Sequence, residues 1–335
     1  MLSGEQNHTP KKITSSVAIC TCDGESFITE QLESIASQSV PVDEIVICDD
    51  NSSDNTLSVV NDFRLKHRSL SITVIHNRER LGVIRNFEQA LRKCSGDIIF
   101  LSDQDDVWLQ DKVQVTIREF VSSPNVEMVF SDALLIDGNG QLITGPHLFD
   151  RFAFTKKIRN MWKAGLEMDI LNVRNVVTGA TVALRKSFLQ TVLPFSESLG
   201  LFHDEQLAIS SAKRGSLKML EEALIQYRVH EKNVVGVWLN RDMKEARRKW
   251  YFPSGIRKEL SMIAPELSWN NESFANERHE LFLSARGRLA LLLSLPKYMK
   301  HYRHFFLSYY VADLTCGLSN WARRRFERIF IPGDK

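Results

Sequence analysis

The chain has 335 residues, of which 43% are hydrophobic, enough to bury a sizeable core and to form about two domains. Lysine and arginine number 43 against 41 aspartate and glutamate residues, so the formal net charge is only +2. This balance gives no reason to expect nucleic-acid binding.

The cysteines and the first residues indicate an intracellular protein. The five cysteines contain no C-x-x-C pair, and Cys20 and Cys48 lie in apolar runs typical of buried strands. The first 16 residues are polar and lack the apolar centre of a signal peptide. We therefore expect reduced thiols and a cytoplasmic location.

Short apolar runs alternate with helical patterns in the first third of the chain. Runs rich in β-branched residues predict strands at 16–22, 43–50, 71–77 and 96–103. Apolar residues at three- and four-residue spacing predict helices at 27–38, 55–67 and 83–94. This alternation is typical of an α/β fold with parallel strands, which binds ligands at the carboxyl ends of its strands.

Polar side chains follow the first two predicted strands. Thr21 and Asp23 come after the first, and Asp50 ends the second. Acidic residues at such positions also form turns and cap helices, and Ser53 or Asp54 is suited to cap the next helix. Ligand contact and local capping both remain open for this region.

The fourth predicted strand runs into three carboxylates, Asp103, Asp105 and Asp106, in the sequence SDQDDVW. Carboxylates this close repel one another and raise each other's pKa unless a cation compensates. Oxygen ligands of this kind suit Mg2+ or Mn2+. The cluster therefore predicts a divalent metal that bridges a diphosphate.

Together these motifs resemble the catalytic domain of family-2 glycosyltransferases. The resemblance rests on TCDGESF, ICDDNSSDNT, LGVIRNFEQAL and SGDIIFLSDQDDVWLQDK. It extends to a later HD, His203 and Asp204, and to YRVH, which ends at His230, as in the bacterial rhamnosyltransferase-like branch. The similarity covers residues 14–236 in the family's order.

The resemblance implies a GT-A fold with a Rossmann-like mixed sheet, a nucleotide-diphosphate sugar donor and inversion at the anomeric carbon. The residues it implies in donor binding are Thr21, Asp23, Asp50, Arg85, Asn86, Asp103 and Asp105. The implied metal ligands are Asp105 and Asp106, with Asp106 as the expected direct one. His230 is a further candidate ligand, and a surface histidine is the alternative interpretation. Cys22 and Asp23 replace the family's usual Tyr-Asn, which leaves the nucleobase contacts open.

The acceptor hydroxyl must lose its proton as it attacks, which requires a carboxylate base on the acceptor side. Asp204 is the candidate, and Glu205 is its rival because an aromatic residue often stands there in the family. Asp204 is equally suited to cap the helix that follows. Gly179, earlier in the chain, either leaves room for a sugar ring or marks a tight turn.

Residues 237–335 change character and predict a helical C-terminal region. Residues 288–330 interleave aromatic and basic side chains, and Pro296 interrupts them before any apolar stretch is long enough to cross a bilayer. Such a segment suits the surface of an anionic membrane, where lipid-linked acceptors are found. A helical pair packed on the catalytic domain is the alternative.

The sequence therefore predicts a metal-dependent, inverting glycosyltransferase of cell-surface polysaccharide synthesis. Its expected donor is a dTDP- or UDP-linked sugar, with rhamnose first, and its expected acceptor is a growing glycan or a lipid-linked glycan. We expect it in the cytoplasm or peripherally on the inner face of the plasma membrane. A catalytically inactive nucleotide-sugar-binding module and a sugar nucleotidyltransferase are the alternatives, although the Gly-rich N-terminal loop of the latter is missing.

Overall fold

The computed structural model describes residues 12–152, 154–173, 175–197 and 201–230. The chain divides into two compact units, Met1–Met168 with Asn175–Val237 and Asp169–Arg174 with Trp238–Lys335. The first unit holds the sheet and the predicted site. The predicted domain boundary at 236/237 and the predicted membrane-docking segment 288–330 lie outside the described residues.

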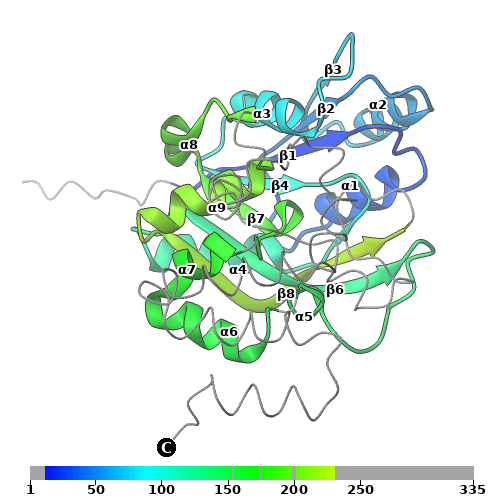
Figure 1. Ribbon diagram of the computed structural model, residues 1–335. Helices are drawn as coiled ribbons and strands as arrows, with labels where there is room; N and C mark the ends of the chain where they lie inside the picture. The colour runs from blue at the N-terminus through cyan, green and yellow to red at the C-terminus, as the bar shows by residue number, and fades with distance from the viewer. Residues whose placement is uncertain (1–11, 153, 174, 198–200, 231–335) are drawn as a thin grey trace, which may run out of the picture. The chain divides into compact units, whose positions relative to one another are not determined.

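Within the described residues, eight strands form one mixed sheet in the order β3-β2-β1-β4-β7-β6-β8-β5 (Figure 1). The strands are β1 Ser15–Thr21, β2 Glu44–Asp49, β3 Ser71–His76, β4 Ile98–Ser102, β5 Val107–Trp108, β6 Met128–Asp137, β7 Val182–Arg185 and β8 Leu217–Val229. Strands β1 to β4 are mutually parallel, and β7 runs antiparallel between β4 and β6. Strand β8 is parallel to β6 and antiparallel to β5. The carboxyl ends of β1, β2 and β4 therefore share one edge.

The helices connect and cover these strands. They are α1 Ile28–Ala36, α2 Thr56–Lys66, α3 Val83–Lys93, α4 Lys112–Ser122, α5 Leu148–Arg151, α6 Lys156–Met161, α7 Glu167–Val173, α8 Lys186–Val192 and α9 His203–Lys213. A π-helical turn, Trp162–Leu166, and a 3-10 turn, Gly179–Thr181, complete the set. The four predicted strands and three predicted helices of the first third are confirmed within two residues at each end.

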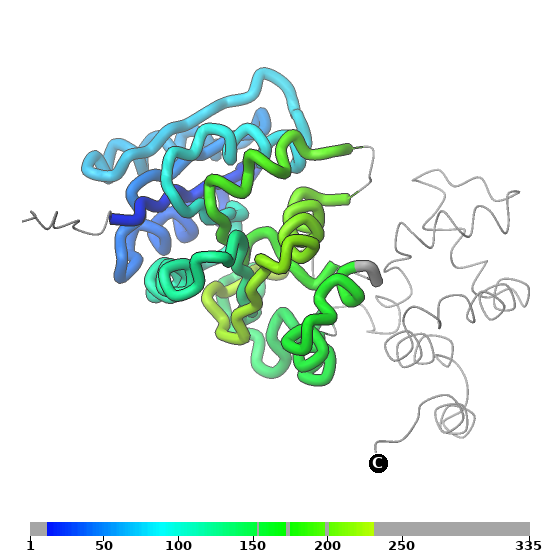
Figure 2. Tube along the Cα trace, turned by 90° about the vertical axis from the view of Figure 1, so that its left-hand side faces the viewer, coloured from blue at the N-terminus to red at the C-terminus, as the bar shows by residue number. Residues whose placement is uncertain are grey.

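Hydrophobic residues pack on both faces of the sheet. Side chains alternate between the faces of a strand, so Val17 and Ile19 of β1 pack with Ile28 and Leu32 of α1 on one face. Helix α3 covers the other face, and α9 lies beside α3 and α8 (Figures 1 and 2). Each fully buried aliphatic side chain contributes about 1.5–3 kcal/mol to folding. This core holds the carboxyl edge of the sheet rigid.

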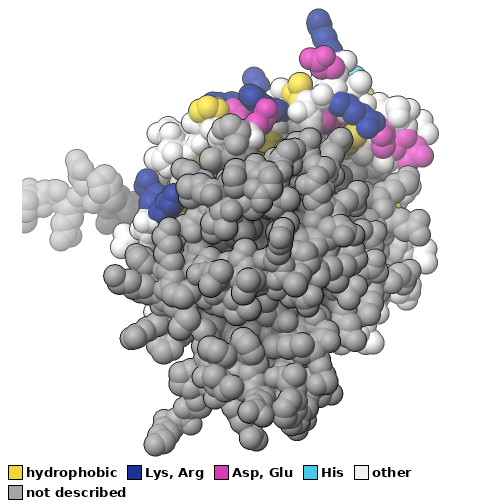
Figure 3. Space-filling model, viewed as in Figure 1, with side chains coloured by type: hydrophobic (Ala, Val, Ile, Leu, Met, Phe, Trp, Pro, Cys, Tyr) yellow, Lys and Arg dark blue, Asp and Glu magenta, His cyan; other side chains and the backbone are white. Residues whose placement is uncertain are grey.

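The described residues include no helix that combines the length and the apolar character needed to cross a bilayer. On the face drawn in Figure 3, acidic and basic side chains of the described residues lie next to one another.

Candidate active site

The loops after β1, β2 and β4 meet at one edge of the sheet. The backbone N–H of Cys22, after β1, donates to Oε1 of Gln104, after β4, at 2.8 Å. The backbone N–H of Ser53, after β2, donates to Oδ1 of Asp23 at 2.7 Å. These contacts join all three loops, so the polar residues predicted at the ends of β1, β2 and β4 lie at the same edge of the sheet.

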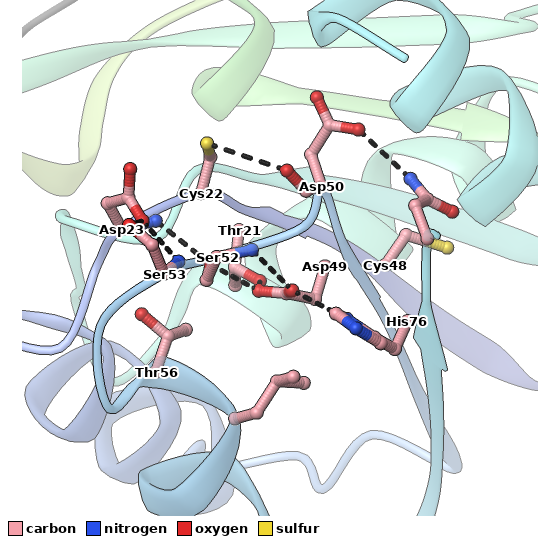
Figure 4. Close-up of polar contacts among 12 residues, drawn as sticks. Thr21, Cys22, Asp23, Cys48, Asp49, Asp50, Ser52, Ser53, Thr56 and His76 are labelled. Atoms are coloured by element: carbon pink, nitrogen blue, oxygen red, sulfur yellow. Dashed lines mark hydrogen bonds and ion pairs between the residues drawn. The ribbon is translucent and has the colours of Figure 1, made fainter. Parts of the chain in front are cut away.

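Asp49 and Asp50 point to opposite sides of the chain at the end of β2 (Figure 4). Asp49 is fully buried. Its carboxylate accepts hydrogen bonds from Oγ1 of Thr21 at 2.8 Å and from the backbone N–H of Ser52 at 2.9 Å, and it lies 3.1 Å from Nδ1 of His76. Thr21, a predicted donor contact, therefore has its hydroxyl directed at Asp49.

Asp50 holds the loop that leads into α3. Its carboxylate accepts hydrogen bonds from the backbone N–H groups of Leu81 at 2.7 Å and Gly82 at 2.9 Å, and from Nδ2 of Asn77 at 3.0 Å. A carboxylate with three such donors is fixed in orientation, so Asp50 shapes this wall of the site. Its predicted contact with the nucleotide remains a prediction.

Asp23 lies in the loop after β1 with a left-handed φ of 50°. Beyond its bond to Ser53, its carboxylate pairs with the guanidinium of Arg80, and the backbone N–H of Ser53 and this guanidinium lower the pKa of Asp23. In the neighbouring loop, the backbone N–H of Thr56 donates a hydrogen bond of 3.0 Å to the carboxylate of Asp54. Asp54 therefore stabilises the start of α2.

Arg85 and Asn86 are neighbours in α3 but have different surroundings. The guanidinium of Arg85 is half-exposed, and its Nε lies 2.5 Å from Oε1 of Glu197. Asn86 is 2% exposed and donates to the carbonyl of Cys48 at 2.8 Å. Asn86 therefore fastens α3 to β2. The donor-binding roles predicted for both residues remain predictions.

The three clustered carboxylates differ in burial, since Asp103 and Asp105 are partly buried and Asp106 is fully buried. Oδ2 of Asp105 lies 2.8 Å from Nε2 of His230. Asp106 is 1% exposed, and its Oδ1 accepts the backbone N–H of Arg228 at 2.9 Å, while its Oδ2 has no hydrogen-bond partner among the described residues. Asp105 is thus the more accessible of the two predicted metal ligands.

Burial and mutual repulsion raise the pKa values of two carboxylates in this cluster, Asp103 and Asp106. Burial, followed by the charges of Asp105 and Asp204, raises the pKa of Asp103 to about 7. Burial, followed by the charges of Asp105 and Asp103, raises the pKa of Asp106 well above its usual range. Raised pKa values of this kind favour the protonated carboxyl groups, and a nearby cation would lower them.

Lys112 supplies a buried positive charge that the sequence analysis did not identify. It is 1% exposed, its Nζ donates to the carbonyl of Ala180 at 2.8 Å, and it lies 4.2 Å from the centroid of the Trp108 ring. Burial lowers its pKa to about 7, although Asp106 and Asp103 act to raise it. Lys112 therefore interacts with the carboxylate cluster and with the 3-10 turn before β7.

Arg228 fastens β8 to the carboxylate loop. The side chain is 2% exposed, and its Nε donates to the carbonyl of Asp105 at 2.6 Å. Its guanidinium also pairs with Glu30 at 2.5 Å and lies 5.0 Å from the ring of Phe27. In YRVH, the arginine thus sets the position of the strand end that presents His230.

Two donor atoms at this edge, one from Asp105 and one from His230, are candidates to contact a divalent metal. Among the described residues, no group of three or more His, Cys, Asp or Glu side chains is arranged to hold an ion. Asp105 and His230 nevertheless present a carboxylate oxygen and an imidazole nitrogen side by side. Mg2+ is commonly bound by one or two carboxylates and completes its shell with substrate phosphates and water, whereas imidazole is a more usual ligand of transition metals.

Asp204 lies in the first turn of α9, and two backbone N–H groups donate hydrogen bonds to its carboxylate. Its Oδ2 accepts the N–H of Gly179 at 3.1 Å, and its Oδ1 accepts the N–H of Glu205 at 2.7 Å. The N-cap of α9 is Phe202, so Asp204 contributes to the first turn without being the cap residue. Burial raises its pKa to about 6, a value suited to a base near neutral pH.

Gly179 allows α9 to approach the sheet closely. A Cβ at this position would lie 3.0 Å from Nε2 of His203 and 3.7 Å from Cβ of Asp204. The rival base Glu205 is 6% exposed, which gives an acceptor hydroxyl little access to it. The turn at Gly179 thus supports the candidate base directly.

Comparison with known proteins identifies a family whose model matches this chain and several proteins of similar sequence. The model of glycosyl transferase family 2 matches residues 16–190. The dTDP-rhamnosyl transferase RfbG of Shigella flexneri is 28% identical over 289 residues, which are 83% of this chain and 93% of the relative. The UDP-Glc:alpha-D-GlcNAc-diphosphoundecaprenol beta-1,3-glucosyltransferase WfgD of Escherichia coli is 24% identical over 238 residues, 70% of this chain and 83% of the relative.

Among solved structures, the mannosyltransferase PcManGT of Pyrobaculum calidifontis, in complex with GDP-Man and Mn2+, resembles the chain with a TM-score of 0.50. The two are 17% identical, and the match covers 95% of this chain and 84% of the other. This likeness concerns the fold alone, and it confirms the predicted GT-A arrangement.

Proposed function

Since the chain belongs to glycosyl transferase family 2, we propose that it transfers a sugar from a nucleotide-diphosphate donor to a hydroxyl group of a glycan or lipid-linked glycan. Reaction by a single displacement inverts the anomeric carbon. This reaction needs a group that offsets charge on the departing diphosphate and a base for the attacking hydroxyl. The candidates for these two roles are a metal held by Asp105 and His230 and the carboxylate of Asp204.

The observation that carries the proposal is the closeness of the carboxylate cluster to Asp204, whose charge acts on Asp103. Lys112, beside the cluster, binds the carbonyl of Ala180 at 2.8 Å. The adjacent Gly179 donates its N–H to Asp204 at 3.1 Å. A donor diphosphate at the cluster and an acceptor at Asp204 would therefore meet across the short turn Gly179–Thr181.

We assign the metal contact to Asp105 and His230. Asp106 was the expected direct ligand, but its 1% exposure leaves a metal less access to it than to Asp105. When bound, the metal would stabilise negative charge on the departing diphosphate. Asp103 and Asp106 would add negative electrostatic potential at the metal, and the positive charge of Lys112 would reduce it.

Asp204 is the proposed base. It would accept the proton of the acceptor hydroxyl while that oxygen attacks the anomeric carbon from the face opposite the diphosphate. Its backbone donors, Gly179 and Glu205, keep the carboxylate oriented. Glu205, the rival base, serves as the comparison in mutagenesis.

The donor proposed first is dTDP-rhamnose, and UDP-linked sugars follow. Support comes from the dTDP-rhamnosyl transferase matched over 93% of its own length and from the UDP-glucose-dependent relative. The lipid-linked acceptor named in the second relative supports a role in polysaccharide synthesis at the inner face of the plasma membrane. Binding of the full-length chain to anionic vesicles would test that location.

Thermal denaturation with a panel of nucleotide sugars and Mn2+ tests the proposed function. A donor at about a hundred times its dissociation constant stabilises the native protein by about 2.7 kcal/mol. Slow hydrolysis of that donor is expected of a transferase. Binding without hydrolysis or transfer would favour the inactive module, and release of pyrophosphate from a nucleoside triphosphate and a sugar phosphate would favour a nucleotidyltransferase.

A further inference from the structure

The side-chain amide of Gln104 is bound to the main chain of Cys22. Its Oε1 accepts the N–H of Cys22 at 2.8 Å, and its Nε2 donates to the carbonyl of Cys22 at 3.0 Å. This reciprocal exchange has the form of a hydrogen-bonded residue pair in an antiparallel ladder, although the strands that it links, β1 and β4, are parallel. It continues the contact between β1 and β4 beyond Ile19 and Ser102, where the strand pairing ends.

Gly24 leaves the space that this amide occupies. A Cβ at Gly24 would lie 2.2 Å from Oε1 and 2.4 Å from Cδ of Gln104, closer than real Cβ contacts. Gly24 is not among the glycines with positive φ. The need for glycine at this position therefore arises from the amide of Gln104 and not from a left-handed backbone.

The two residues joined by the amide stand between functional side chains. Cys22 lies between Thr21 and Asp23, which the family resemblance places near the nucleoside. Gln104 lies between Asp103 and Asp105, on the diphosphate and metal side. The amide thus spans the two parts of the site that a single donor molecule must contact together.

We propose that Gln104 and Gly24 form a clamp between two segments of the site. One is the loop after β1 with Thr21 and Asp23, called the nucleoside loop below, and the other is the carboxylate pair Asp103 and Asp105. The clamp fixes the spacing between them. The inference rests on the proposed function. A ligand that contacts two linked subsites gains affinity only when their geometry permits simultaneous contact. Gln104 is accordingly a positioning residue, which acts through its neighbours Asp103 and Asp105.

Calorimetric titration of the full-length protein tests the clamp. The probes are UDP, UMP, dTDP and dTMP, each with Mn2+, and the base that binds wild type more tightly is used for the variants. Gln104→Ala and Gln104→Met should weaken the diphosphate by about tenfold or more, because the chelate advantage is lost. The monophosphate, which uses chiefly the nucleoside loop, should change by less than about twofold. Gln110→Ala, at an exposed position nearby, is the matched control.

A double-mutant cycle separates the clamp from general damage. Gly24→Ala alone should reproduce the selective loss because its methyl group displaces the amide. In the Gln104→Ala background, Gly24→Ala should add little, since the obstructing amide is gone, and the two effects should be strongly non-additive. If Gln104→Ala fails to fold, Gln104→Met takes its place in the cycle.

The titrations distinguish failure of the clamp from failure of the proposed function. Wild-type affinity for the diphosphate in Gln104→Ala and Gln104→Met, or an equal loss for monophosphate and diphosphate, would overturn the clamp while leaving the proposed function intact. A wild-type protein that does not prefer diphosphate over monophosphate in Mn2+ would overturn the proposed function, and the clamp with it.

Discussion

The backbone N–H of Gly179 donates a hydrogen bond of 3.1 Å to the carboxylate of Asp204. This bond joins the turn before β7 to the first turn of α9, two segments that approach closely because residue 179 has no side chain. It stabilises the ionised form of Asp204 against the effect of burial. The site thus holds a carboxylate that is poised to exchange a proton near neutral pH.

Asp204→Asn should abolish most transfer while preserving the fold. Asparagine keeps the size of the side chain and much of its hydrogen bonding but cannot take up the proton, so turnover should fall by about 10²- to 10⁴-fold. Donor affinity, measured by titration, should stay within about twofold of wild type because Asp204 serves the acceptor. Near-normal turnover in Asp204→Asn, together with loss in Glu205→Gln, would transfer the role to Glu205.

The pH dependence of transfer should follow the ionisation of Asp204. Burial raises its pKa to about 6, and only the ionised form accepts a proton. We therefore expect kcat/KM to fall as the pH drops below about 6. A rate profile that is flat between pH 5 and pH 7 would contradict this role.

The same shift has the opposite consequence for stability. Because the folded-state pKa of Asp204 is raised, the native state binds more protons than the unfolded state between the usual pKa near 3.8 and about 6. The contribution of this group to stability is therefore fully present below that window and is lost as the pH rises through it. As the pH rises from 4 to 7, the melting temperature of wild type should therefore fall relative to that of Asp204→Asn, which has no group that titrates at this position, as calorimetry can determine.

The sequence predicted the sheet edge well because its signals are local. Alternating β-branched runs and amphipathic helices identify β1 to β4, and polar residues at strand ends identify the edge itself. It did not predict the antiparallel insertion of β7 or the pairing of β5 with β8, since these depend on contacts distant in sequence. Long-range pairing leaves little trace in local periodicity.

The direction of individual side chains was harder to predict. Asp49 and Asp50 are adjacent, yet one bonds Thr21 and the other bonds the loop at Leu81 and Gly82. Lys112 was missed because lysine is almost never fully buried without a compensating partner, and its partners are distant in sequence. Only the folded structure distinguishes a carboxylate that fixes a loop from one that faces a ligand.

Removal of divalent metal should abolish donor turnover, and single variants should locate the metal. Asp105→Asn and His230→Ala should each raise the Mn2+ concentration needed for half-maximal activity by about tenfold or more, because each removes one of two proposed ligands. Asp106→Asn should shift this concentration less, since its Oδ1 is bound to Arg228. Full activity in excess EDTA would exclude a metal role, and a larger shift for Asp106→Asn would restore Asp106 as the direct ligand.

Lys112→Met should make the stability of the protein depend more strongly on divalent metal. Methionine fills similar volume but leaves the carbonyl of Ala180 without its 2.8 Å hydrogen bond and removes the buried charge that offsets Asp103 and Asp106. Loss of a buried hydrogen-bond partner costs about 1–3 kcal/mol, so the melting temperature should fall. Mn2+ bound with nucleoside diphosphate at Asp105 would place the positive charge of the ion beside Asp103 and Asp106, and should therefore raise the melting temperature of Lys112→Met more than that of wild type. Lys93→Met, at an exposed lysine of α3, is the matched control. An equal rise in wild type and Lys112→Met would show that Lys112 acts only through packing and its bond to Ala180.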